Sequence, residues 1–69
     1  MKMYKISFVN NKPVSASEMP VANKVRVDIH YPENKKVINS ITVFAQNAFE
    51  GVNVANNIAA YLLDNDTDN

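Results

Sequence analysis

The 69-residue sequence contains no cysteine, one glycine and one histidine. Without cysteine the chain can form neither a disulfide nor a thiolate metal site. Because Gly51 is the only glycine, a glycine-rich loop that cradles phosphate cannot be built. His30 is a lone imidazole, whereas zinc sites and nucleophilic triads need further ligands or an orienting acid around it. We therefore expect no enzymatic activity, no metal, no cofactor and no small-molecule substrate.

Long apolar runs are missing as well. No stretch has the length and composition of a signal peptide or a membrane span, so the sequence predicts no membrane association. The lack of cysteine fits a cytoplasmic location. A chain this short buries roughly 60% of its unfolded surface, so its stability depends on a small core, a partner or self-association. We expect one α+β domain over residues 1–64 and a disordered acidic tail over residues 65–69.

Alternation of apolar and polar residues predicts three strands, over residues 1–9, 24–31 and 37–46. The last two are joined by a turn at Pro32-Glu33-Asn34-Lys35, in which Asn34 can adopt a positive φ. Between the first two strands, residues 11–23 contain two prolines and predict a long segment that is irregular over most of its length and covers one open end of the sheet. Within it, Ser15–Met19 could form a single helical turn or a short edge strand. The apolar face of these strands is expected to point towards the core. Its aromatic members are Tyr4, Phe8 and Tyr31.

The third strand runs directly into a helix that ends near Leu63. Asn47 followed three residues later by Glu50 is a capping-box pair, which fixes the start of this helix. Gly51 costs the helix roughly 0.5–1 kcal/mol relative to alanine, so it either permits close packing or is neutral drift. The apolar stripe of the helix is expected to pack on the sheet. Its members are Ala48, Phe49, Val52, Ala55, Ile58, Ala59 and Leu62.

These elements predict a two-layer α+β fold in β-β-β-α order, with a three-stranded antiparallel sheet and one C-terminal helix on one face. One helix leaves the opposite sheet face uncovered. If odd-numbered residues of the third strand face the helix, Ile38 and Phe44 lie on this open face, where apolar side chains indicate contact with a partner. The candidate protein-binding residues are Ile38, Phe44, Arg26, His30 and Met19.

The charge distribution offers a second interpretation. The formal net charge is zero, but all seven lysines and arginines lie in the first 36 residues, and every charged residue after them is acidic. This polarity is consistent with solubilising strands or with nucleic-acid binding. The strand–strand–strand–helix order resembles the latter part of a double-stranded RNA-binding domain, but the first helix and the lysines at the start of the last helix are missing. The candidate nucleic-acid-binding residues are Lys5, Lys24, Arg26, Lys35 and Lys36.

The sequence thus predicts a protein that acts by binding another molecule rather than by catalysing a reaction. The leading hypothesis is a small protein-binding module, with a partner of unknown identity, that binds and inhibits or modulates a larger host protein. The Asn-, Lys- and Ile-rich composition would suit a phage or mobile-element accessory protein. The alternatives are a nucleic-acid-binding protein and a structural subunit or homodimer, which could associate edge to edge or through open faces.

Overall fold

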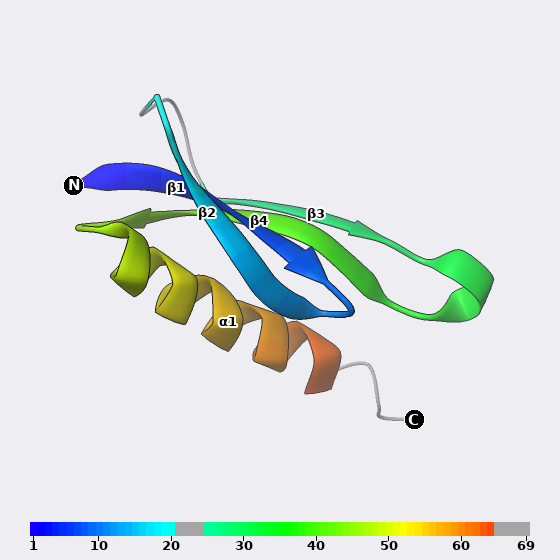
Figure 1. Ribbon diagram of the computed structural model, residues 1–69. Coiled ribbons are helices and arrows are strands. Elements are labelled where there is room, and N and C mark those ends of the chain that lie inside the picture. Colours follow the sequence, from blue (N-terminus) through cyan, green and yellow to red (C-terminus); the bar gives the residue numbers. More distant parts are fainter. Residues whose placement is uncertain (21–24, 65–69) are drawn as a thin grey trace.

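The computed structural model describes residues 1–20 and 25–64. It confirms an α+β fold in which one C-terminal helix packs on one face of an antiparallel sheet (Figure 1). The sheet has four strands in the spatial order β2-β1-β4-β3, so the prediction of three strands was wrong. The predicted tail and Lys24 lie outside the described residues. The elements are β1 (Lys2–Val9), β2 (Lys12–Met19), β3 (Arg26–His30), β4 (Val37–Ala45) and α1 (Ala48–Asp64).

The additional strand, β2, comes from the segment that was predicted to be irregular. Asn10 and Asn11 both adopt positive φ angles, 54° and 62°, and form a two-residue turn that pairs β2 with β1. Such turns match the twist of a hairpin, and asparagine tolerates their backbone better than most residues. Pro13 is compatible with β2 because β2 is an edge strand, where one row of amides has no ladder partner.

The side chain of Asn11 ties this turn to the start of β4. Its Oδ1 accepts a hydrogen bond from the backbone N–H of Ile38 at 2.9 Å, and its Nδ2 donates to the carbonyl of Lys36 at 3.2 Å. A side-chain amide carries the same donor and acceptor as a peptide group. The pairing of β1 with β4 ends at Ser7 and Ser40, so Asn11 satisfies backbone groups at the start of β4 and in the residue before it, beyond the end of that ladder.

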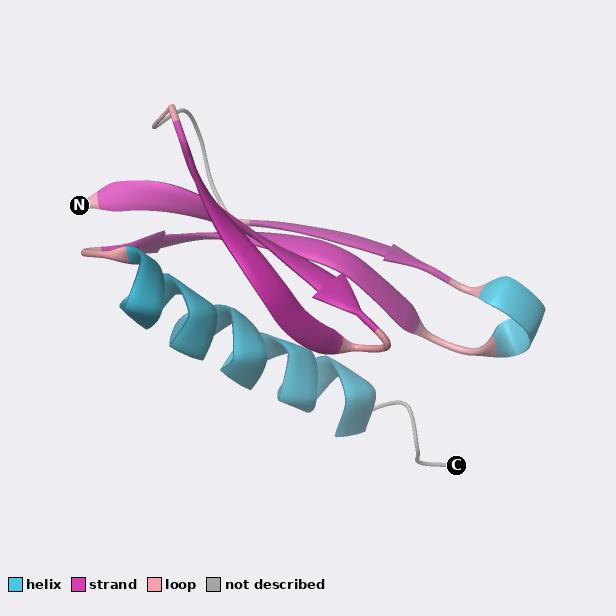
Figure 2. Ribbon diagram, in the orientation of Figure 1, coloured by secondary structure: helices cyan, strands magenta, loops and turns pink. Residues whose placement is uncertain are grey.

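The β3–β4 turn has the same backbone character. Glu33 and Asn34 have φ angles of 52° and 66°, and the N–H of Lys35 donates to the carbonyl of Pro32 at 2.9 Å. The predicted turn and the positive φ of Asn34 are therefore confirmed. This segment contains a short 3-10 turn, η1 (Pro32–Asn34), which Figure 2 colours as a helix beyond the ends of the two strands.

A bulge in β4 reverses the side-chain alternation at its start. Asp28 of β3 pairs with Ser40, whereas the next residue, Ile29, pairs with Ile38, so Asn39 has no partner. One extra residue shifts every preceding side chain to the other sheet face. Ile38 therefore joins the core and is only 1% exposed. The prediction that Ile38 lies on the open face was wrong, because simple alternation does not anticipate the bulge.

The predicted start of the helix is confirmed in its essentials. Oδ1 of Asn47 accepts a hydrogen bond from the N–H of Glu50 at 2.8 Å. Oε1 of Glu50 in turn accepts from the N–H of Gln46 at 2.7 Å, one residue earlier than in the usual capping box. At the other end of α1, Nζ of Lys36 donates to the carbonyl of Leu62 at 2.9 Å. A cation is favourable there because the helix dipole places partial negative charge at its C-terminus.

The core lies between α1 and the face of the sheet that the helix covers. A row of small residues one turn apart, Gly51, Ala55 and Ala59, is the buried side of the helix. A Cβ atom on Gly51 would lie 3.4 Å from Cβ of Tyr4 in β1. Gly51 is therefore at a close approach between helix and strand. The remaining core side chains are Ile6, Phe8, Ile38, Ile41, Val43 and Ala45.

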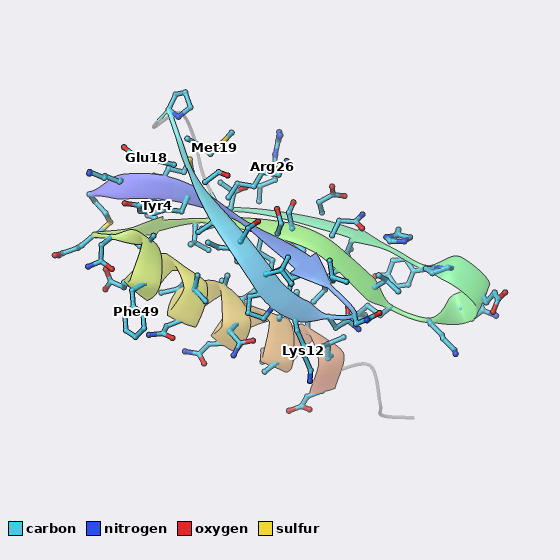
Figure 3. The ribbon with its side chains drawn as sticks, viewed as in Figure 1. Tyr4, Lys12, Glu18, Met19, Arg26 and Phe49 are labelled. Atoms are coloured by element: carbon cyan, nitrogen blue, oxygen red, sulfur yellow. The ribbon has the colours of Figure 1, made fainter. Side chains whose placement is uncertain are left out.

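One helix does not cover the whole sheet. The main contacts of α1 are with β4, β2 and β1, and β3 lies beyond them at the edge (Figure 1). Tyr31, which was predicted to face the core, is accordingly exposed at the end of β3. Phe49 is 78% exposed and points away from the sheet (Figure 3), and Ala48 is also exposed, so both were wrongly assigned to the packed stripe.

The position of Gly51 predicts opposite effects of small and branched side chains. The Gly51→Ala variant should be more stable by about 0.5–1 kcal/mol, because a methyl group at 3.4 Å makes an ordinary contact and alanine has the higher helix propensity. Gly51→Val should instead lower the free energy of unfolding, by about 1–3 kcal/mol, because the branches would overlap Tyr4. Urea denaturation measures both, and equal effects of the two substitutions would contradict the proposed close approach.

The role of Asn11 predicts that a better turn sequence will weaken the protein. Asn11→Gly creates Asn-Gly, the most favourable pair for this turn, but removes both bonds to β4. The free energy of unfolding should fall by about 1–3 kcal/mol because the N–H of Ile38 loses its partner. The control Asn10→Gly keeps those bonds and should change stability by less than about 0.5 kcal/mol. Unchanged or increased stability of Asn11→Gly would show that the bridge is unimportant.

Candidate functional site

The sheet face opposite α1 is the main uncovered surface in the described part of the chain. The ladder registers arrange its side chains in rows that cross the strands. Lys5 of β1 pairs with Thr42 of β4, which pairs with Arg26 of β3. In the next row Ser7 pairs with Ser40, which pairs with Asp28. The middle of this open face is therefore polar, with basic and acidic side chains on neighbouring rows.

One end of the open face is apolar. Met3 of β1 pairs with Phe44 on one side and with Met19 of β2 on the other, so the three side chains form a continuous row. Met3 is only 4% exposed although it does not belong to the core beneath the helix. Phe44 is half-buried and Met19 remains 37% exposed. We call Met3, Met19 and Phe44 the apolar row.

A concavity of about 400 Å³ adjoins this row. Met19 contributes to its wall, and Figure 3 shows Met19 and Arg26 projecting from the side of the sheet opposite the helix. Ser40, which is buried, and Thr42 supply hydroxyl groups from β4, the strand between the charged side chains. The concavity thus combines an apolar wall with hydrogen-bonding and charged groups, as sites that hold a segment of another molecule do. Its lining residues are Lys5, Met19, Arg26, Val27, Asp28, Ser40 and Thr42.

The structure brings together part of the predicted protein-binding set. Phe44, Met19 and Arg26 all lie on the open face or its concavity. His30 is exposed and pairs with Val37 two residues beyond Asp28, outside the residues that line the concavity. Ile38 lies in the core and cannot contact a partner there, so we omit it from the site.

The predicted nucleic-acid-binding residues do not gather in one place. Lys5 and Arg26 flank Thr42 on the open face. Lys35 lies next to the turn, and Lys36 is directed to the C-terminal end of α1 through its bond to Leu62. Lys24 lies outside the described residues. The fourth strand also changes the element order, which removes the resemblance to the latter part of a double-stranded RNA-binding domain.

Five residues of the site were not among the predicted binding residues: Met3, Val27, Asp28, Ser40 and Thr42. Alternation places Met3 on the same face of β1 as Lys5, but its two apolar neighbours could not be identified without the register of β1 against β2 and β4. The Asn10-Asn11 pair is the sequence signal that could have identified Met19 as a neighbour of Met3, because a two-residue turn fixes which residues of the two strands face each other. Met19 is then placed opposite Met3 once the β2 bulge is allowed for.

The described residues contain no group of three or more histidine, cysteine or acidic side chains placed to hold a metal ion. Within the same residues, α1 and the short turn η1 are the helical segments, and neither has the length and apolar character needed to cross a membrane. The ion pair between Lys2 and Glu18, at 3.9 Å, is exposed on both sides and adds little stability.

Comparisons with protein-family models, with curated proteins and with solved structures found no match to this chain.

Proposed function

We propose that this chain is a small non-enzymatic protein-binding module that uses the open face of its sheet. The observation that carries the proposal is the apolar row beside a charged concavity on a face that no described element covers. In the core of interfaces, apolar side chains supply most of the affinity, and nearby polar groups fix the register of the partner. A module of this kind acts by occupying its partner, as an inhibitor or an accessory subunit does.

The chemistry of the site favours a partner segment that combines an apolar side chain with a carboxylate. The apolar chain would pack on Met19 and Phe44, which lie on either side of Met3. The carboxylate would lie near Lys5, in the row next to Met3 and towards the concavity. Such a charge-assisted contact adds specificity and raises the association rate more than it adds affinity.

Selection from a random peptide library displayed on phage tests this proposal directly. The immobilised protein should enrich peptides in which an acidic residue lies within a few positions of a large apolar residue. Binding of an enriched peptide should weaken at least tenfold, about 1.4 kcal/mol, on Met19→Asp, Phe44→Asp or Lys5→Glu. Fluorescence anisotropy with a labelled peptide measures the dissociation constants, and circular dichroism verifies that each variant is folded.

The matched control is Asn53→Asp, which adds a negative charge on the exposed side of α1, far from the open face. It should leave peptide affinity unchanged. The proposal is wrong if no peptide is enriched, or if the enriched peptides bind the open-face variants as tightly as the original protein. Loss of binding in the Asn53 variant alone would place the binding surface on the helix instead.

A further inference from the structure

The two edges of the sheet differ in how well they are protected from pairing with another strand. β2 carries Pro13, a bulge at Val14 and lysine at its first position, all of which discourage edge-to-edge association. β3 is a regular five-residue strand, Arg-Val-Asp-Ile-His, with no proline and no extra residue of its own. Among the described strands, none pairs with its outer row of backbone N–H and C=O groups.

The side of β3 that faces away from the open face is apolar and poorly covered. Val27 and Ile29 pair with the core residues Ile41 and Ile38, so they lie on the same side of the sheet as α1. Because α1 packs mainly on the other three strands, Val27 is 38% exposed and Val25, directly before β3, is 48% exposed. A bare edge with exposed valines is a surface suited to a further strand.

The charges on β3 indicate that the strand pairing with its edge is β3 of a second copy of the chain. Arg26 and Asp28 pair with Thr42 and Ser40, so both lie on the open-face side, one on each side of Val27. In an antiparallel pair, directly opposite residues share one sheet face, and opposite charges there attract. If two β3 strands face each other about Val27, each Arg26 lies opposite Asp28 of the second copy. Val25 then lies opposite Ile29 of the second copy.

We propose that two copies of this chain pair antiparallel through β3, with the two-fold axis at Val27, and form a continuous eight-stranded sheet. This register gives two Arg–Asp pairs on one face and an uninterrupted apolar ladder of Val25, Val27 and Ile29 on the other. The same patch serves both subunits, as a two-fold interface requires. Both helices lie on one side of the sheet, and neither packs mainly on the strand at the interface.

The neighbouring symmetric registers are disfavoured by the same charges. Centring the axis on Asp28 places the two aspartates opposite each other, and centring it on Arg26 places the two arginines opposite each other. Like charges directly opposite each other destabilise a strand pair. Of these three registers, the one centred on Val27 is the one that places opposite charges against each other. Arg26 and Asp28 also line the concavity, but the apolar row and Lys5 are not part of this interface. The dimer can therefore fail while the substitutions at Met19, Phe44 and Lys5 still weaken peptide binding, so the two proposals are tested separately.

Sedimentation velocity of charge-swapped variants tests the dimer and its register. The original chain should show a concentration-dependent shift from its 7.7 kDa mass towards twice that value. Arg26→Asp alone or Asp28→Arg alone creates two like-charge pairs and should weaken self-association at least tenfold. An equimolar mixture of these two variants restores both attractive pairs and should form a heterodimer. The double variant Arg26→Asp/Asp28→Arg should dimerise again by itself.

A second test uses the lack of cysteine in the chain. In the proposed register Val27→Cys places two thiols opposite each other at the axis, within reach of a disulfide under mild oxidation. Asp28→Cys, which would face its counterpart only in the neighbouring register, should crosslink far more slowly. The control is Lys12→Asp, which changes the charge by two units, as Arg26→Asp does, but on the β2 edge. It should leave the dimer intact.

A chain that stays at 7.7 kDa up to its solubility limit would overturn the proposal. So would a dimer that Arg26→Asp and Asp28→Arg both leave unchanged, or one that Lys12→Asp abolishes. A dimer that the double variant fails to restore, together with rapid crosslinking of Asp28→Cys, would refute the register centred on Val27.

Discussion

The structure depends on the area that one helix can cover. α1 is 17 residues long and packs mainly on β4, β2 and β1, through a buried row of a glycine and two alanines. Small side chains bring the helix close to β1, and the buried apolar side chains fill the space between the helix and the middle of the sheet. The opposite sheet face and the outer strand β3 stay uncovered. Both candidate interaction surfaces follow from this single limit.

Much of the fold could be predicted because local signals agreed with the tertiary structure. Alternation placed β1, β3 and β4 close to their observed positions, and Asn47 with Glu50 fixed the start of α1. One helix was expected to leave one sheet face open, and Phe44 and Arg26 lie on that face as alternation predicted, whereas Met19 was expected in an irregular segment. These predictions required only periodicity and capping, which are properties of neighbouring residues.

The errors concern features that depend on residues distant in sequence. Asn10-Asn11 could be recognised as a loop, but its hairpin geometry decides that residues 12–19 form a strand rather than an irregular segment. The bulge at Asn39 shows itself only in the pairing of β4 with β3, and it alone moves Ile38 from the open face to the core. The exposure of Phe49 reflects the rotation of α1 about its axis, which is set by the close contact of Gly51 with Tyr4.

Because the edge of β3 is unpaired among the described strands, the concentration of the chain would determine whether this edge is free or paired. An unpaired edge accepts any compatible strand, so a second copy and an unrelated chain would compete for the same backbone groups. By mass action, a dilute chain would leave the edge available, whereas an abundant chain would occupy it with its own copies. Self-pairing of this kind would convert a surface that promotes uncontrolled aggregation into a closed assembly, and the cellular concentration of the protein would set the fraction of free edges.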